Sequence, residues 1–312
     1  MTVVALRQVF NEVLMEIAPQ HPELVVLTSD SRGSAALSPF AQTYPKQFIE
    51  VGIAEQNIVG IASGLASCGY TPFVFSPACF LSMRAIEQIK VDVAYSGTNV
   101  KLIGISGGVS YGTLGMSHHS LQDIAVTRAI PGLQVVLPSD RFEVRKLVDA
   151  LLTDRHGTYV RIGRNPVRDV YADDNFAFEI GKAVRLRQGE DVTLVSTGEM
   201  VRLALDVWER LAHEGISATV LNMHTLKPFD RNAILAEVNK TRLFVTLEEH
   251  SIHGGLGGAV AEVLSQECPK PLLILGIPDE PAVTGSQQEI LAHYGLTPEG
   301  VTNTVLGRMK RL

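Results

Sequence analysis

The chain contains 312 residues with a formal net charge of −6; 46% of its residues are hydrophobic and 19% are charged. This length is typical of two domains, each able to bury a core of its own. No basic run, no apolar stretch near the ~20 residues of a spanning helix and no basic-then-apolar N-terminal signal occurs, so the sequence predicts neither a nucleic-acid nor a membrane partner.

In the first half of the chain, short β-rich runs alternate with longer segments of helical period, the pattern of α/β units around a mainly parallel sheet. A polar stretch at residues 163–179 follows and is typical of a linker. We expect strands at residues 24–27, 71–75, 100–105, 133–137 and 158–161, and helices at residues 3–17, 54–67, 80–95, 121–129 and 141–152.

A second α/β block then begins. We expect strands starting at residues 191, 217 and 242, and helices at residues 200–213 and 231–239. The sequence therefore predicts an α/β fold of two domains, each a mainly parallel sheet flanked by helices. The expected bounds are residues 1–170 for the first domain, 171–185 for a linker and 186–312 for the second domain.

The sequence lacks the common phosphate-binding and metal-binding motifs. No G-x-x-x-x-G-K-[ST] loop occurs, and G-G-L-G-G at residues 254–258 favours a tight packing turn into a helix at Ala259 over an anion site. Cys68, Cys79 and Cys268 lack metal-ligand spacing, so we expect small core residues. This cysteine usage favours a reducing, cytoplasmic setting.

A glutamate in the segment F-I-E-V-G-I-A-E-Q-N, residues 48–57, stands one step inside a predicted helix, directly after an apolar, strand-like run. On spacing alone, Glu55 is explained by the favourable interaction of an acid with a helix N-terminus. An exposed position on a half-buried helix explains it equally simply. The segment by itself therefore favours a capping acid.

The motifs around this glutamate carry a resemblance to a known family. E-V-G-I-A-E-Q-N (50–57), G-I-A-S-G-L-A (60–66), G-T-L-G-M-S-H-H-S-L-Q-D-I-A (112–125) and R-A-I-P-G-L (128–133) resemble the pyrimidine-binding domain of transketolases. L-K-P-F-D (226–230) and E-E-H-S-I-H-G-G-L-G (248–257) are similar to the C-terminal domain of that family. The resemblance covers nearly the whole chain and implies a thiamine diphosphate enzyme.

The resemblance also implies a missing half. Full transketolases carry a further N-terminal domain that holds the diphosphate and its Mg2+ through a G-D-G motif, and no G-D-G occurs here. We therefore expect the C-terminal half of a split transketolase, active with an N-terminal subunit that holds most of the Mg2+ site. The family further implies a homodimer of this chain within a heterotetramer, acting on sugars or sugar phosphates.

For Glu55 the resemblance implies catalysis. In the family, an acid that is hydrogen-bonded to N1' of the cofactor's aminopyrimidine favours the imino form, which removes the C2 proton. We expect apolar surroundings at this acid, because burial disfavours its charged form. Phe80 matches an aromatic that stacks on the ring, with an ordinary core position as the alternative. Pro77 replaces the family's second aromatic residue.

His118 matches the histidine that contacts the sugar hydroxyl or the developing alkoxide, and imidazole suits proton transfer near neutral pH. The adjacent His119 leaves an exchange of roles open.

Phosphate-binding positions of the family match Arg7, Ser34 and Arg164. A guanidinium donates two parallel hydrogen bonds to phosphate, and a weak surface or interdomain ion pair is the alternative role. Asp30 resembles an acid near the cofactor, and a turn-forming aspartate explains it as well.

Two departures concern the substrate. Leu114 replaces an acid that recognises the donor's C2 hydroxyl, and Ser106 replaces a histidine at a strand end. We therefore expect a donor or acceptor different from those of the pentose phosphate pathway. Besides ketol transfer, two hypotheses stay open: the β subunit of a 2-oxoacid dehydrogenase, and a non-catalytic α/β subunit.

Overall fold

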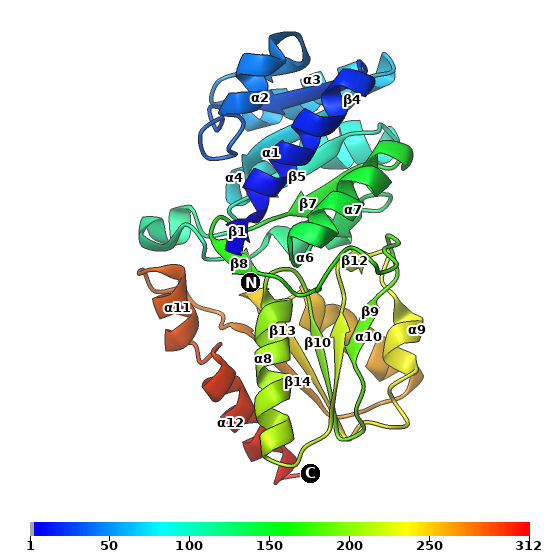
Figure 1. Cartoon of the computed structure of the whole chain (residues 1–312), viewed down its shortest axis with the longest axis vertical. Coiled ribbons are helices and arrows are strands. Elements are labelled where there is room, and N and C mark those ends of the chain that lie inside the picture. Colours follow the sequence, from blue (N-terminus) through cyan, green and yellow to red (C-terminus); the bar gives the residue numbers. More distant parts are fainter. Residues whose placement is uncertain (1–2) are drawn as a thin grey trace.

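The computed structural model describes residues 3–312, which form two α/β units stacked end to end (Figure 1). Neighbouring strands run parallel in both sheets except at the edge strands β12 and β9. The first sheet has the order β12 (Thr225–Lys227), β6 (Gln134–Val136), β7 (Thr158–Arg161), β5 (Lys101–Ile105), β4 (Thr71–Pro77), β2 (Leu24–Thr28) and β3 (Phe48–Glu50). The second has the order β14 (Leu272–Ile277), β13 (Leu243–Ser251), β10 (Val192–Ser196), β11 (Ala218–Asn222) and β9 (Val184–Arg187).

Helices cover both faces of the first sheet, because successive side chains of a strand point to opposite sides. In β2, Val25 and Leu27 enter one core while Leu24 and Val26 enter the other. One face packs against α1 (Leu6–Ile17), α2 (Ser38–Thr43) and α7 (Arg141–Thr153). The other face packs against α3 (Glu55–Ser67), α4 (Ala78–Arg84), the π-helix η3 (Ile89–Tyr95) and α6 (Asp123–Ala129).

The second sheet is covered in the same way. Helices α8 (Met200–His213) and α12 (Pro298–Met309) lie on one face, and α9 (Arg231–Leu235) and α10 (Leu256–Glu267) lie on the other. Helix α11 (Gln287–His293) lies beside the boundary between the units (Figure 1). The mainly parallel sheets and their helices confirm the predicted fold class.

The two units share one hydrophobic core. Leu137 of the first unit packs in the same cluster as Met223 and Leu226 of the second. Strand β12 comes from the second half of the chain, yet it pairs with β6 of the first sheet. The two units are therefore joined by backbone pairing as well as by side-chain packing.

Several sequence expectations are wrong in detail. Residues 3–5 begin no helix; they form β1 (Val3–Ala5), which pairs with β8 (Pro166–Arg168) inside the polar stretch at residues 163–179. The helix expected at residues 80–95 is divided into α4, α5 (Ile86–Gln88) and η3. In α4, Ser82 Oγ donates to the carbonyl of Ala78, a bond that bends helices.

Another concerns Cys68, expected in the core, which is exposed at the end of α3. Cys79 is buried as expected, and Cys268 is partly buried. Helix α10 begins at Leu256, earlier than the expected Ala259, and the carboxylate of Glu248 accepts hydrogen bonds from the amides of its first two residues. Within residues 3–312, no helix is long and apolar enough to cross a membrane.

Candidate active site

Glu55 is the first residue of α3, just after the loop that leaves β3. Its side chain is only 6% exposed, and Nη1 of Arg84 donates to both carboxylate oxygens at 3.0 Å. The hydrogen bonds of the carboxylate therefore go to Arg84 rather than to amides of the first helical turn. The expectation of apolar surroundings is wrong for the single chain, because a cation from the end of α4 faces the buried acid.

The same arginine contacts Phe80. The Arg84 guanidinium carbon lies 3.9 Å from the centre of the Phe80 ring, a cation–π arrangement. Both residues belong to α4, where residues four apart share a face. Phe80 is half-buried rather than enclosed in the core, so its ring is available at the surface. The Arg84 guanidinium is a flat group that lies over Phe80 and donates N–H to Glu55. A flat ring with an N–H group could make the same two contacts.

His118 continues this cluster on the loop after η4 (Gly112–Ser117). Its ring lies 5.1 Å from that of Phe80 and 5.3 Å from that of Tyr111, with an edge of one ring toward a face of the other in both pairs. Its Nδ1 is 2.9 Å from Ser117 Oγ. His119 is buried instead, and its Nε2 is 2.9 Å from the carbonyl of Gly112. The geometry favours His118 over His119 as the group that faces a substrate.

Two arginines lie at the far end of the cluster. The Arg164 guanidinium is 5.3 Å from the centre of the Tyr111 ring, and Arg7 Nη1 donates to the backbone carbonyl of Ser34 at 2.6 Å. Burial, and then the charge of the nearby Arg164, lower the pKa of Arg7. Within the described chain, Arg7 Nε and Arg164 Nη1 are buried without a hydrogen-bond partner. Buried, unpaired N–H groups on adjacent cations suit an anion.

Asp30 is joined to the end of β3. Its backbone has a φ of 51°, its side chain is exposed, and its amide donates to Glu50 Oε1 at 2.7 Å. This is the turn that follows β2, so its local geometry is that of a turn-forming aspartate.

The two departures from the family also have defined places. Ser106, with a φ of 58°, is buried at the end of β5, and within residues 3–312 its Oγ has no partner. Leu114 is half exposed on η4.

Sequence reasoning missed Arg84 and Tyr111. Arg84 is four residues after Phe80 in the same predicted helix, a spacing that places both side chains on one face. Tyr111 joins His118 to Arg164 only because the loop after β5 folds back, which no local pattern indicates.

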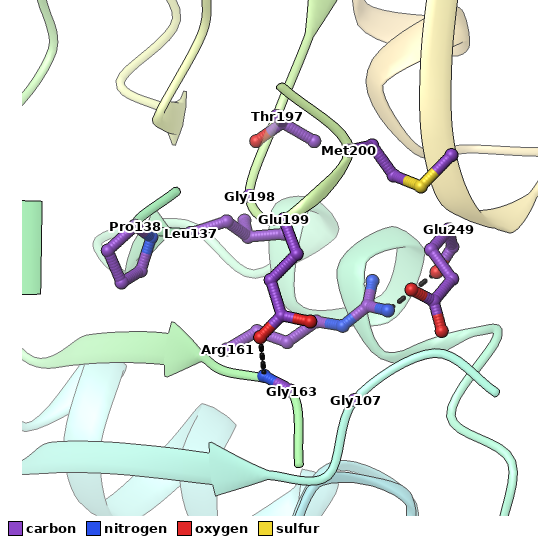
Figure 2. A pocket seen from close by; sticks show the side chains of 10 residues that line it. All are labelled: Gly107, Leu137, Pro138, Arg161, Gly163, Thr197, Gly198, Glu199, Met200 and Glu249. Carbon is purple, nitrogen blue, oxygen red and sulfur yellow. Dashed lines mark hydrogen bonds between the residues drawn. The ribbon is translucent and has the colours of Figure 1, made fainter. Parts of the chain in front are cut away.

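The domain boundary contains a second group of charged side chains (Figure 2). Arg161, Glu199 and Glu249 line a small cavity of about 20 Å³ together with glycines of both units. Burial and the charge of Glu249 raise the pKa of Glu199 to about 8. Burial also raises the pKa of Glu249, against the opposing charge of Arg161. This cavity is large enough for about one water molecule and too small for a cofactor.

No group of three or more His, Cys, Asp or Glu side chains within residues 3–312 is arranged to hold a metal ion.

The candidate active site therefore consists of a buried acid, an aromatic face, a histidine and two arginines. Contacts connect Glu55 through Arg84, Phe80, His118 and Tyr111 to Arg164.

Comparison with known proteins assigns both halves of the chain to one family. Residues 2–169 match the transketolase pyrimidine-binding domain, and residues 181–301 match the transketolase C-terminal domain. The chain belongs to the transketolase family. Glu55, Phe80, His118 and Arg164 all lie within the part that matches the pyrimidine-binding domain.

Similar transketolase proteins have nearly the same length as this chain. An apulose-4-phosphate transketolase subunit of Phocaeicola vulgatus is 49% identical over 99% of this chain and 98% of its own length. A 6-deoxy-6-sulfo-D-fructose transketolase subunit of Clostridium sp. is 38% identical over 95% of this chain and 92% of its own.

A solved structure described as a split gene transketolase, inactive beta4 tetramer, superposes with a TM-score of 0.88 at 36% identity, covering 99% of both chains. These relatives confirm the resemblance to a split transketolase. They favour the transketolase reading over the β subunit of a 2-oxoacid dehydrogenase.

Proposed function

We propose that this transketolase-family chain is the pyrimidine-binding subunit of a thiamine diphosphate-dependent enzyme that transfers a two-carbon ketol unit from a ketose to an aldose. The observation that carries the proposal is the continuous set of contacts from Glu55 through Arg84 and Phe80 to His118. A buried acid and an aromatic face at one end, with anion-binding groups at the other, match the two ends of a cofactor–sugar pair.

The residues fit an aminopyrimidine. The Arg84 guanidinium already makes the two interactions that such a ring needs, a contact over Phe80 and N–H donation to Glu55. Arg84 is 48% exposed, so its side chain can turn away into solvent. When bound, thiamine diphosphate supplies a nucleophilic carbon that attacks the ketose carbonyl and stabilises the charge left after C–C cleavage.

The side chains then have separate tasks. Glu55 keeps a proton shared with N1' of the pyrimidine, and Phe80 orients the ring by stacking. The Nδ1 of His118 is engaged by Ser117, so Nε2 is the nitrogen that exchanges a proton with a sugar hydroxyl.

For the far end of the sugar, we propose that Arg7 and Arg164 bind an anionic group, with Ser34 beside them. The support is the pair of buried, unpartnered guanidinium N–H groups. The names of the two relatives above contain a phosphate and a sulfo group, both anionic. With Leu114 and Ser106 in place of an acid and a histidine, we propose a sugar whose hydroxyl configuration and anion position differ from those of pentose phosphates. For Asp30 we propose a minor role at the cofactor end.

The rest of the cofactor site comes from a partner in this proposal. Large apolar side chains are exposed on the pyrimidine-binding unit, among them Ile53 at 74% and Tyr95 at 88%, together with Met83, Leu114 and Met116. An apolar surface of this kind marks an association site. We propose that a second copy of this chain and an N-terminal subunit with the Mg2+ and diphosphate site cover it in a cytoplasmic heterotetramer.

Reconstitution tests this function. The purified chain is mixed with the subunit that carries G-D-G, thiamine diphosphate and Mg2+, and then assayed with a ketose phosphate and an aldehyde. We expect a ketose product that only the complete mixture forms. Decarboxylation of a 2-oxo acid with transfer to a lipoyl domain, in place of ketol transfer, would contradict the proposal.

A further inference from the structure

The two loops that carry the substrate-facing side chains are both held by residues of the second domain. One is the loop at 106–120, between β5 and α6, which contains Tyr111 and His118. The other is the short loop at 162–165 after β7, which contains Arg164. Both loops donate hydrogen bonds to side chains from across the domain boundary.

The shorter loop is fixed on both sides of Arg164. The amide of Gly163 donates to Glu199 Oε1 at 3.0 Å, as Figure 2 shows. The side-chain Nδ2 of Asn165 donates to Gln287 Oε1 at 2.6 Å. Glu199 directly precedes α8, and Gln287 is the first residue of α11. Because both neighbours of Arg164 are tied, its backbone is held in place while its side chain lies over Tyr111.

The longer loop is fixed near its start. Gly108 and Ser120 form an antiparallel bridge that closes its base, and the amide of Val109 donates to Glu249 Oε1 at 2.7 Å. Gln287 Nε2 donates to the two carboxylate oxygens of Glu249 at 3.0 and 2.9 Å. One amide group therefore joins both loops: its oxygen holds Asn165 and its nitrogen holds Glu249.

Glycines allow the two loops to lie close to the side chains of the second domain. A Cβ at Gly163 would overlap the carboxylate of Glu199, and a Cβ at Gly108 would overlap that of Glu249 and the Arg161 guanidinium. Glu249 is buried, and Arg161 donates to its backbone carbonyl. The bond from Val109 to Glu249 is therefore shielded from water, where a hydrogen bond is worth more than at the surface, and the other bonds of the set are partly buried.

We propose that Glu199, Glu249 and Gln287, the interdomain clamp, are positioning residues for the substrate. By holding the loop of Arg164 against the loop of His118, they set the distance between the group that binds the sugar's anion and the group that handles its hydroxyl protons. This inference rests on the proposed function for the identity of the substrate. All residues of the clamp belong to this chain, so the clamp does not depend on the partner subunit.

Gln287→Ala tests the clamp by removing the side-chain amide that joins the two loops. In the reconstituted enzyme we expect KM for the sugar phosphate to rise about tenfold and kcat to change less than about threefold, because the loss concerns substrate placement. Gln288→Ala is the matched control, since the exposed side chain of the next residue on α11 takes no part in the clamp. It should keep the wild-type KM.

Glu199 offers a second pair of variants. Glu199→Gln keeps an oxygen for the amide of Gly163 and should keep the wild-type KM, whereas Glu199→Ala removes the acceptor and should raise KM. Hydrogen–deuterium exchange of the chain alone gives a readout without activity. We expect faster exchange of peptides from residues 106–120 and 162–165 in Gln287→Ala and Glu199→Ala only.

Two results would overturn the clamp. One is an unchanged KM together with unchanged exchange in both loops. The other is faster exchange throughout the chain with a parallel loss of kcat and thermal stability, which would mean a merely structural role. A wild-type complex without ketol transfer would contradict the proposed function instead, and the exchange experiment on the chain alone would still decide the clamp.

Discussion

Replacement of Glu55 by glutamine separates catalysis from folding. The carboxylate pairs with Arg84, whose side chain is 48% exposed, and pairs of this kind contribute about 0 to 1 kcal/mol to stability. Glutamine has nearly the same shape and keeps an oxygen that can accept from Arg84. We therefore expect Glu55→Gln to lower the free energy of unfolding by less than about 1 kcal/mol, and to leave association with the partner unchanged.

The chemical effect should be much larger. A side-chain amide provides no acidic proton to share with the pyrimidine nitrogen, so ionisation of the cofactor at C2 should slow. We expect kcat to fall by at least about 100-fold, which corresponds to about 2.7 kcal/mol of transition-state stabilisation. The assay is hydrogen–deuterium exchange at C2 of thiamine diphosphate in the reconstituted complex, with thermal unfolding recorded in parallel.

A role for Glu55 in the helix alone makes the opposite prediction. Loss of a favourable charge at the start of α3 costs about 0.3 to 1 kcal/mol of stability and leaves the chemistry unchanged. Wild-type C2 exchange in Glu55→Gln, accompanied by a lower melting temperature, would refute the catalytic assignment.

Four further predictions address other parts of the structure. Arg164→Ala should raise the inhibition constant of inorganic phosphate at least about tenfold, since a charge-assisted bond is lost, and an unchanged constant would remove Arg164 from the anion site. Arg84→Ala should strengthen thiamine diphosphate binding by the complex up to about fivefold in calorimetry, because a weak competing ion pair disappears; weaker binding would show that Arg84 assists the cofactor. Because the pKa of Glu199 is raised to about 8, the folded chain keeps a proton that the unfolded chain loses, so the free energy of unfolding should fall as pH rises from about 4.5 to 8. Denaturant titrations at several pH values should show a flatter profile for Glu199→Gln. The isolated chain should bind thiamine diphosphate weakly in calorimetry, and micromolar, Mg2+-dependent binding would contradict the need for a partner.

The central strands and long helices could be predicted from sequence. Strands β2, β5 and β10 are mainly apolar and are buried at every residue, as expected inside a parallel sheet with two covered faces. Helix α8 begins and ends at the expected residues because its apolar stripe is long and regular. The short edge strands β1, β8, β9 and β12 were not expected, since three or four residues carry too little periodicity to reveal a distant partner.

The candidate site also contains residues that the sequence predicts and residues that it does not. Glu55, Phe80 and His118 stand in motifs, so the resemblance pointed to them. In the structure Glu55 and Phe80 both contact Arg84, and His118 contacts Phe80. Their roles are still predictions. The contribution of Gln287 depends on a fold that brings α11 across the domain boundary, 122 residues from its partner Asn165. No local pattern encodes such a contact.

The transfer of labelled carbon tests the proposed chemistry most directly. A ketose phosphate donor labelled with 13C at both C1 and C2 is incubated with an unlabelled aldehyde, the reconstituted complex, thiamine diphosphate and Mg2+, and the product is analysed by mass spectrometry and NMR. Ketol transfer predicts that both labelled carbons arrive together, still bonded to each other, in a product two carbons longer, and that Glu55→Gln abolishes it. A product in which the two labelled carbons are no longer bonded to each other, or equal transfer by the Glu55→Gln complex, would contradict it.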